Sequence, residues 1–226
     1  MVTHSYYKGA MPKIVDPDQR RQELAQAVWR VIRREGVEHA SVRSVAREAG
    51  LSTGSLRHYF GSQAELLVFA MRMVMEQIEE RVAAVPRPED PLTAAKVVLA
   101  HLLPLDAERR AENEVWVAFT ARALVDEQLG ALRDEAYDRL RRASEYWIDD
   151  ILRGASADHR RIESARLFAL IDGLALHAAM RPDLATPHEL SRVLNHHLDH
   201  VTASHTRTDA AQHITRPRDP TSDRDH

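Results

Sequence analysis

Residues 41 to 60 hold the side chains best suited to contact a DNA duplex. Ser41 is a good cap for a first helix, and Gly50 can end that helix in the left-handed backbone conformation that favours glycine. A second helix follows, and Gly54 and Ser55 keep its first turn slim, so that its backbone can approach base edges. Two short helices around a glycine turn predict a helix–turn–helix. An ordinary helical hairpin in a core is the alternative.

Basic residues are concentrated in the same part of the chain. Residues 1 to 62 carry ten Lys and Arg against six Asp and Glu, a net charge of +4, whereas the remainder carries −7. A domain that faces phosphates needs such an excess. The acidic remainder disfavours DNA binding elsewhere.

The chain lacks the residue patterns of an enzyme or a metalloprotein. It has no Cys, which excludes thiolate nucleophiles and Cys-based zinc sites and fits a reducing cytoplasm. It contains no glycine-rich phosphate loop, serine nucleophile elbow or His-Glu-x-x-His motif. His196 and His200 are spaced i, i+4, but zinc needs a third ligand. We expect no catalysis, no cofactor and no metal site.

No segment is predicted to enter a membrane. The most apolar stretch, residues 167–180, contains Asp172 and His177 and is too short to span a bilayer. Residues 1–12 lack the apolar run of a signal peptide. We expect a cytoplasmic protein without a membrane partner.

The elements that position these residues are all predicted to be helices. Apolar side chains recur at helical spacing, prolines and glycines interrupt them, and no strand alternation occurs. The predicted fold is all-α, with a three-helix DNA-binding domain followed by a larger helical domain for ligand binding and dimerisation. The expected organisation is a flexible arm (1–15), the DNA-binding domain (16–62), the larger domain (63–203) and a disordered tail (204–226).

One helix of the larger domain is apolar on nearly all sides between residues 167 and 180. A surface helix needs only one apolar stripe, so a second subunit would cover the other face, and the last helix would complete a four-helix interface. A central core helix of a monomer is the alternative. A dimer is favoured because one helix–turn–helix contacts too few base pairs for useful specificity. The residues expected at the interface are Leu170, Leu174, His177, Leu190, Leu194 and Leu198.

The helix–turn–helix residues resemble those of the TetR family of transcriptional regulators. The resemblance covers residues 17–68 and rests on Ser41-Val42-Arg43-Ser44-Val45-Ala46, Gly50-Leu51-Ser52-Thr53-Gly54-Ser55-Leu56 and His58-Tyr59-Phe60. Residues 115–119 and 171–174 more weakly resemble the ligand domain of the family's choline-responsive betaine-pathway branch. The resemblance implies an all-helical homodimer that binds a double-stranded DNA operator and is released by a small-molecule inducer.

The resemblance also implies which residues contact DNA. Ser41, Arg43, His58 and Tyr59 correspond to phosphate contacts, and base edges or the adjacent backbone correspond to Thr53, Gly54, Ser55 and Arg57. Arg57 stands where an aromatic residue is common, and it can bind either a guanine or a phosphate. Gln63 stands where a phosphate-binding lysine is usual, and implies a weaker, uncharged contact.

A ligand pocket is expected in the larger domain, where most of the aromatic residues lie. The expected lining residues are Met71, Met75, Leu102, Trp116, Phe119, Thr120, Trp147, Phe168 and Asp172. Tryptophan rings near a carboxylate suggest a cationic or amine ligand as a hypothesis, and simple core filling is the alternative. The sequence thus predicts a ligand-responsive repressor. An architectural or ligand-independent helix–turn–helix protein is the second possibility, and a filled core would favour it.

Overall fold

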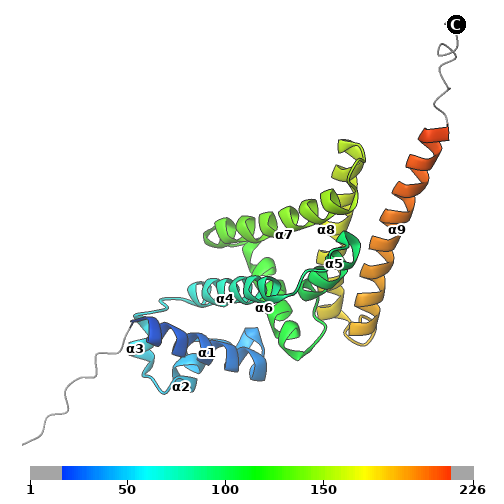
Figure 1. The fold of residues 1–226 in the computed structure, drawn as a ribbon. Helices are drawn as coiled ribbons and strands as arrows, with labels where there is room; N and C mark the ends of the chain where they lie inside the picture. Colours follow the sequence, from blue (N-terminus) through cyan, green and yellow to red (C-terminus); the bar gives the residue numbers. More distant parts are fainter. Residues whose placement is uncertain (1–16, 215–226) are drawn as a thin grey trace, which may run out of the picture.

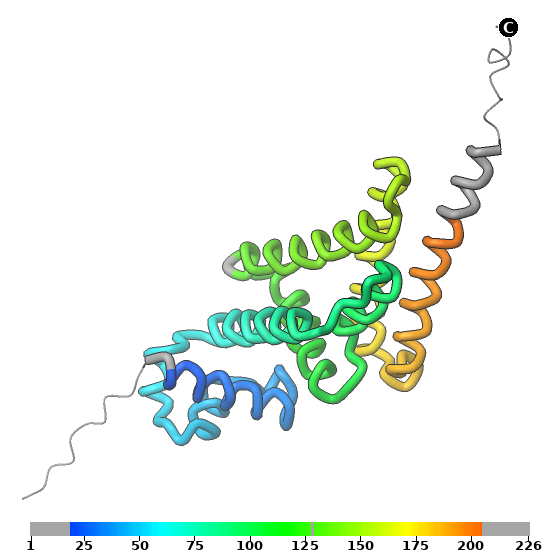
Figure 2. Tube along the Cα trace, in the orientation of Figure 1, coloured from blue at the N-terminus to red at the C-terminus, as the bar shows by residue number. Residues whose placement is uncertain are grey.

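The computed structural model describes the backbone of residues 17–214 and, apart from residue 128, the side chains of residues 19–204. The expected N-terminal arm lies outside these residues. The described part of the chain forms helices and no strand, which confirms the all-α prediction (Figures 1 and 2). The order is α1 (Pro17–Glu35), η1 (Val37–His39), α2 (Val42–Glu48), α3 (Thr53–Arg57), α4 (Gln63–Ala84), α5 (Pro91–Leu99), η2 (Ala100–Leu102), α6 (Ala107–Ala123), η3 (Glu127–Leu129), α7 (Gly130–Ile151), α8 (Ala157–Met180) and α9 (Pro187–Ile214).

The first three helices form a small unit at one end of the molecule (Figure 1). The α1 helix buries a stripe of Leu24, Val28, Val31 and Ile32. The α2 helix begins at Ser41, whose hydroxyl accepts a hydrogen bond from Ser44 N at 3.1 Å, while Ser41 N donates to Ser44 Oγ at 2.8 Å. This reciprocal cap satisfies two backbone donors and fixes where the helix–turn–helix starts.

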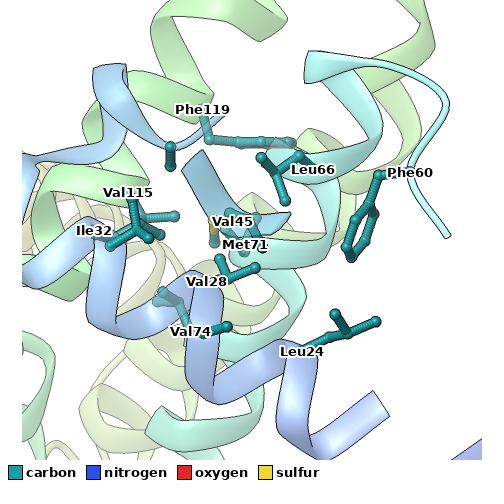
Figure 3. Close-up of a cluster of buried hydrophobic side chains, with 14 of the residues drawn as sticks. Leu24, Val28, Ile32, Val45, Phe60, Leu66, Met71, Val74, Val115 and Phe119 are labelled. Carbon is teal, nitrogen blue, oxygen red and sulfur yellow. The ribbon is translucent and has the colours of Figure 1, made fainter. Parts of the chain in front are cut away.

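The α4 helix connects this unit to the rest of the molecule (Figure 1). Ser62 caps it by accepting from Glu65 N at 3.1 Å, and the Glu65 carboxylate accepts from Gly61 N at 2.8 Å. Figure 3 shows α1 side chains such as Val28 meeting Met71 and Val74 of α4 and Val115 of α6. The domain boundary predicted between residues 62 and 63 therefore does not separate two cores, because one hydrophobic core contains side chains from both sides of it.

A second core lies between α5, α8, α9 and the C-terminal half of α7. Leu99, Ile148, Leu167, Leu194 and Leu198 are among its fully buried members. Asp106 caps α6 by accepting from Arg109 N at 2.8 Å, and this fixes where the helix begins.

The last helix is longer than the sequence analysis predicted. It runs to Ile214 rather than ending near residue 203, so residues 204–214 are helical and not part of a disordered tail. The physical reason is that the segment contains no proline or glycine before Pro217. Residues 215–226 lie outside the described chain. No helix among the described residues is long and apolar enough to cross a membrane.

Gly50 offers a direct test of the predicted turn. Its φ is +67°, and we expect Gly50→Ala to lower the free energy of unfolding by about 1 kcal/mol, because side chains with a Cβ disfavour that conformation. Urea denaturation followed by far-UV circular dichroism measures the change.

The matched control is Gly54→Ala in α3, where an added Cβ meets only Ser52 Oγ at an ordinary 3.7 Å. There the substitution should stabilise the helix, by up to about 1 kcal/mol. A loss of stability of equal size in both variants would show that backbone conformation at Gly50 is not the cause.

Candidate DNA-binding helix and ligand cavity

The inner side of α3 packs against the protein core, and the N-terminus of this helix is capped. Leu56 is fully buried, and the ring of Phe60 packs against Phe69 of α4 with 5.0 Å between centroids. Ser52 caps α3 by accepting from Ser55 N at 3.0 Å. The turn before α3 is closed by Leu51 N, which donates to Ala46 O at 2.9 Å. These contacts fix the orientation of a helix only five residues long.

The opposite side of this helix faces solvent. Every residue predicted to contact base edges is exposed, namely Thr53, Gly54, Ser55 and Arg57. His58 and Tyr59, two of the residues predicted to contact phosphates, are exposed as well. Arg43 is also exposed in the first turn of α2, and Ser41 is half-buried in its cap. The structure therefore brings the predicted DNA-binding residues to one end of the molecule.

The arginines of this unit divide into paired and unpaired groups. Glu48 of α2 accepts from Arg30 Nε at 2.7 Å and lies 2.9 Å from Arg34 Nη2, both on α1. Hydrogen bonds from Arg30 and then Arg34 lower the pKa of Glu48. Among the described residues, Arg43 and Arg57 form no salt bridge, so their guanidinium groups are available for phosphates or bases.

Gln63 has a hydrogen-bond partner within the protein. Its Nε2 donates to Ala40 O at 2.6 Å, so this amide joins the first turn of α4 to the loop before α2. The physical reason is proximity: the start of α4 lies against that loop, and an uncharged amide finds a backbone acceptor there. The structure thus gives Gln63 a positioning contact within the protein, and the phosphate contact that the resemblance implies stays a prediction.

A cavity of about 380 Å³ lies in the larger domain, lined by residues of α4, η2, α6, α7 and α8. Five of the expected pocket residues line it: Met71, Met75, Leu102, Trp116 and Asp172. Most of the wall is apolar, including Val74, Ile78, Leu140 and Ile171. A volume and composition of this kind suit a small organic molecule.

The other four expected residues do not line this cavity. Phe119 and Thr120 lie about one turn beyond Trp116 on α6, where that helix packs against α1 and η1, and Phe119 is fully buried in the first core. Trp147 is buried in the second core, and Phe168 packs against Tyr137 with 5.7 Å between ring centroids. Helical spacing placed these side chains in the domain but did not show which face each one shares.

Polar groups that the sequence analysis missed form part of the wall. Arg81 of α4 makes two hydrogen bonds to Glu112 of α6, at 2.7 and 2.5 Å, and the Glu112 side chain is only 5% exposed. Asn113 donates to Ala175 O of α8 at 2.8 Å. His101 and Arg109 line the same end of the cavity. No local motif marks these residues, because each pair joins positions far apart in the chain.

Asp172 has an environment unlike that of the other acidic residues in the wall. Its carboxylate accepts from Trp116 Nε1 at 3.3 Å and has no salt-bridge partner within the described chain. The neighbouring Tyr137 ring packs on both Trp116 and Phe168, and burial, followed by the charge of Asp172, raises the pKa of Tyr137. Glu79 and Glu112, in contrast, are each paired with an arginine.

Three of the six residues expected at the dimer interface are not available there. Leu190, Leu194 and Leu198 are buried inside the protomer and cannot meet a second subunit. Leu170 and Leu174 are partly buried and His177 is exposed. The outward side of α8 instead carries a stripe of small and apolar residues, namely Ile162, Ala165, Ala169, Leu176 and Met180.

Comparison with known proteins decides the family. Residues 24–68 match the model of bacterial regulatory proteins of the tetR family, and residues 88–203 match the C-terminal domain of BetI-type transcriptional repressors. The chain is 40% identical over 206 residues to the HTH-type transcriptional regulator PksA of Bacillus subtilis, covering 90% of this chain and 100% of that protein. The chain belongs to the TetR family of transcriptional regulators.

Solved structures of other transcriptional regulators share the fold. A transcriptional regulator from Rhodococcus sp. RHA1 has a TM-score of 0.70 and 32% identity, covering 81% of this chain and 96% of that one. A putative regulator from Saccharomonospora viridis, solved in complex with choline, has a TM-score of 0.67 and 21% identity, covering 81% and 97%. An N-terminal helix–turn–helix domain followed by a larger C-terminal helical domain is the arrangement of the family.

The Gln63 contact can be tested without DNA. We expect Gln63→Ala to lower the free energy of unfolding by about 1 kcal/mol, because Ala40 O loses its donor. Urea denaturation of the free protein measures this, with Gln22→Ala on the exposed side of α1 as the control.

A pure phosphate contact predicts a different pattern. It leaves the stability of the free protein unchanged and weakens only the DNA complex. That pattern would contradict the positioning role.

Proposed function

We propose that this regulator binds a pseudo-palindromic operator as a dimer through α3, and that an organic cation in the cavity releases it. One observation carries the proposal: α4 lines the cavity from Met71 to Val82, while its first residue, Gln63, bonds to the loop before α2. A ligand that displaces α4 therefore also displaces the DNA-binding unit. Operator affinity then falls by the difference in ligand affinity between the two conformations.

The DNA-binding role is supported by the chemistry of the exposed side of α3. Arg43 and Arg57 offer unpaired guanidinium groups, and the hydroxyls of Thr53 and Ser55 stand beside a glycine that adds no bulk. The conserved geometry of such a helix places its first residues against base edges in the major groove. The net positive charge of this unit supplies the electrostatic part of binding.

Dimerisation is supported by the outward stripe on α8. Ala165 and Ala169 permit close approach of a second helix, and Leu176 and Met180 are 44% and 68% exposed. An outward apolar stripe on α8, with α9 beside it, suits a four-helix interface between two copies. Two copies would hold two α3 helices for two half-sites.

An organic cation is the ligand class that the cavity favours. Asp172 is half-buried without a basic partner among the described residues, and Trp116 beside it presents an aromatic ring to the same cavity. A cation would pair with the carboxylate and contact the ring face. The choline complex of the Saccharomonospora viridis regulator supports the same class of ligand.

A ligand-independent architectural protein is the second candidate. Such a protein needs no cavity, and a filled core would favour it. The cavity of about 380 Å³ beside α4 favours the ligand-responsive function instead.

The DNA-binding proposal predicts two different effects of removing an arginine. With an operator selected from random duplexes, Arg43→Ala should weaken binding to all sequences and reduce the salt slope by about one phosphate contact. Arg57→Ala should cost about 1–3 kcal/mol and relax the preference at one base pair if Arg57 contacts a base. Fluorescence anisotropy over a range of salt concentrations measures both.

Two control variants complete this experiment. Arg110→Ala, on the exposed side of α6, should leave binding unchanged. Ala169→Glu places a charge on the outward stripe of α8, and light scattering should show a monomer. This monomer should bind DNA only with the weak, salt-dependent affinity of a non-specific complex. Operator binding of full affinity by a protomer, or binding unaffected by both arginine substitutions, would overturn the proposal.

The cation proposal predicts the effect of neutralising Asp172. We expect Asp172→Asn to weaken the binding of alkyl-ammonium ligands by about 10- to 100-fold, because a charge-assisted contact of about 1.5–3 kcal/mol is lost. Isothermal titration calorimetry with an alkyltrimethylammonium and with an uncharged alcohol of the same length measures it. Equal losses for the two ligands would show that the charge of Asp172 does not recognise them.

A further inference from the structure

Charged side chains from four helices line the cavity. They are Glu79 of α4, Arg109 and Glu112 of α6, Arg139 and Arg142 of α7, and Asp172 of α8. Most of them form ion pairs within the protein, namely Glu79 with Arg139, Glu112 with Arg81, and Arg109 with Asp106. These pairs neutralise the charges of the residues that form them. Arg142 and Asp172 remain.

The two remaining side chains have opposite charges and form no salt bridge among the described residues. Asp172 is half-buried, and its carboxylate accepts a hydrogen bond from Trp116 Nε1 at 3.3 Å. Arg142 is exposed, which places it on the solvent side of the cavity wall. A carboxylate attracts a cation and a guanidinium group attracts an anion. The wall therefore offers a ligand one unpaired charge of each sign.

Arg142 and Asp172 lie at different levels of the cavity. About two turns of α7 line it, from Ala136 to Ala143. Tyr137, at the start of this segment, packs against Trp116, the hydrogen-bond partner of Asp172, with 5.7 Å between ring centroids. Arg142 lies near the other end of the segment, five residues beyond Tyr137. The rise of an α-helix makes that offset about 8 Å along α7.

We propose that Arg142 binds an anionic group of the ligand while Asp172 binds its cationic group, so that the ligand is a zwitterion with its charges about 8 Å apart. The proposal rests on the proposed function in that the cavity is the inducer site, and it narrows the ligand class from an organic cation to a zwitterion. A guanidinium group matches the two oxygens of a carboxylate, which is the anionic group that we assign to the ligand.

A zwitterion suits this wall better than a simple cation does. It neutralises both unpaired charges, whereas a simple cation pairs only with Asp172 and is repelled by Arg142. The competing explanation is that only the alkyl stem of Arg142 lines the cavity, while its guanidinium group stays in water. Removing the charge while keeping the stem separates the two explanations.

Three probes with the same six-carbon chain test the two charges of the ligand. They are trimethylammonio-hexanoate, with the cation on the terminal carbon; its methyl ester, which lacks the negative charge; and hexyltrimethylammonium. The extended chain of the zwitterion places its charges roughly 8 Å apart. Isothermal titration calorimetry gives each dissociation constant.

The variants of the full chain change one charge at a time. Arg142→Met keeps an unbranched stem without the charge, Arg142→Lys keeps the charge, and Asp172→Asn neutralises the carboxylate. Arg110→Met is the matched control, because Arg110 is an exposed arginine of α6 that does not line the cavity.

The expected result is that the wild-type protein prefers the zwitterion to its ester and that Arg142→Met removes this preference. Arg142→Met weakens the zwitterion about 3- to 10-fold, as expected for an ion pair with an exposed arginine, and does not weaken the two cations, which lose a repulsive charge. Arg142→Lys restores part of the preference. Asp172→Asn weakens all three probes, and Arg110→Met changes none of them.

The outcomes distinguish failure of this proposal from failure of the proposed function. If the wild-type protein binds the zwitterion no better than its ester, if Arg142→Met weakens all three probes equally, or if Arg110→Met gives the same loss, Arg142 does not recognise an anionic group and the proposal is overturned. If Arg142→Met weakens only the zwitterion but Asp172→Asn affects no probe, the cation proposal fails and anion recognition by Arg142 stands. If no probe binds the wild-type protein, both fail.

Discussion

The packing of α4 into two groups of helices at once is the constraint on which the rest of the structure depends. Its side chains Met71 and Val74 complete the core of α1 and α2 together with α6, and Met71, Ile78 and Val82 line the cavity of the larger domain. The 22 residues of this helix span roughly 30 Å at the usual rise per residue. Because helices are stiff and interiors are close-packed, a displacement of α4 at the cavity would also move the end of α4 that contacts the DNA-binding unit.

Polar contacts connect α4 to neighbouring elements near both of its ends. Gln63 bonds to Ala40 O at its start, and Arg81 bonds to the buried Glu112 near its end. Removing one partner of a buried ion pair leaves an uncompensated charge, so the second contact strongly favours one position of α4 against α6. A ligand bound in the cavity would lie beside this pair, since Glu112 is part of the wall.

Some charged side chains are paired within the protein, whereas others have no such partner among the described residues. Arg30 and Arg34 are held by Glu48, and Arg139 by Glu79 and Glu135, whereas Arg43, Arg57 and Asp172 have no such partner in the described chain. The sequence alone does not show which basic and acidic residues are paired in the folded protein and which are not. Partners such as Arg139 and Glu79 are 60 residues apart, so only folding brings them together.

Local signals in the sequence determined the first helices and the turn of the helix–turn–helix. Ser41, Gly50 and Ser62 act within four residues of themselves, through caps and a left-handed turn, so their effects could be predicted from spacing alone. The tertiary structure alone decided which faces of α6 and α9 meet which neighbours. It placed Phe119 in a core and Trp116 at the cavity, turned Leu194 inward and gave Gln63 an acceptor. The reason is that an apolar face shows only that a helix is covered, whereas the identity of the covering element depends on contacts between distant parts of the chain.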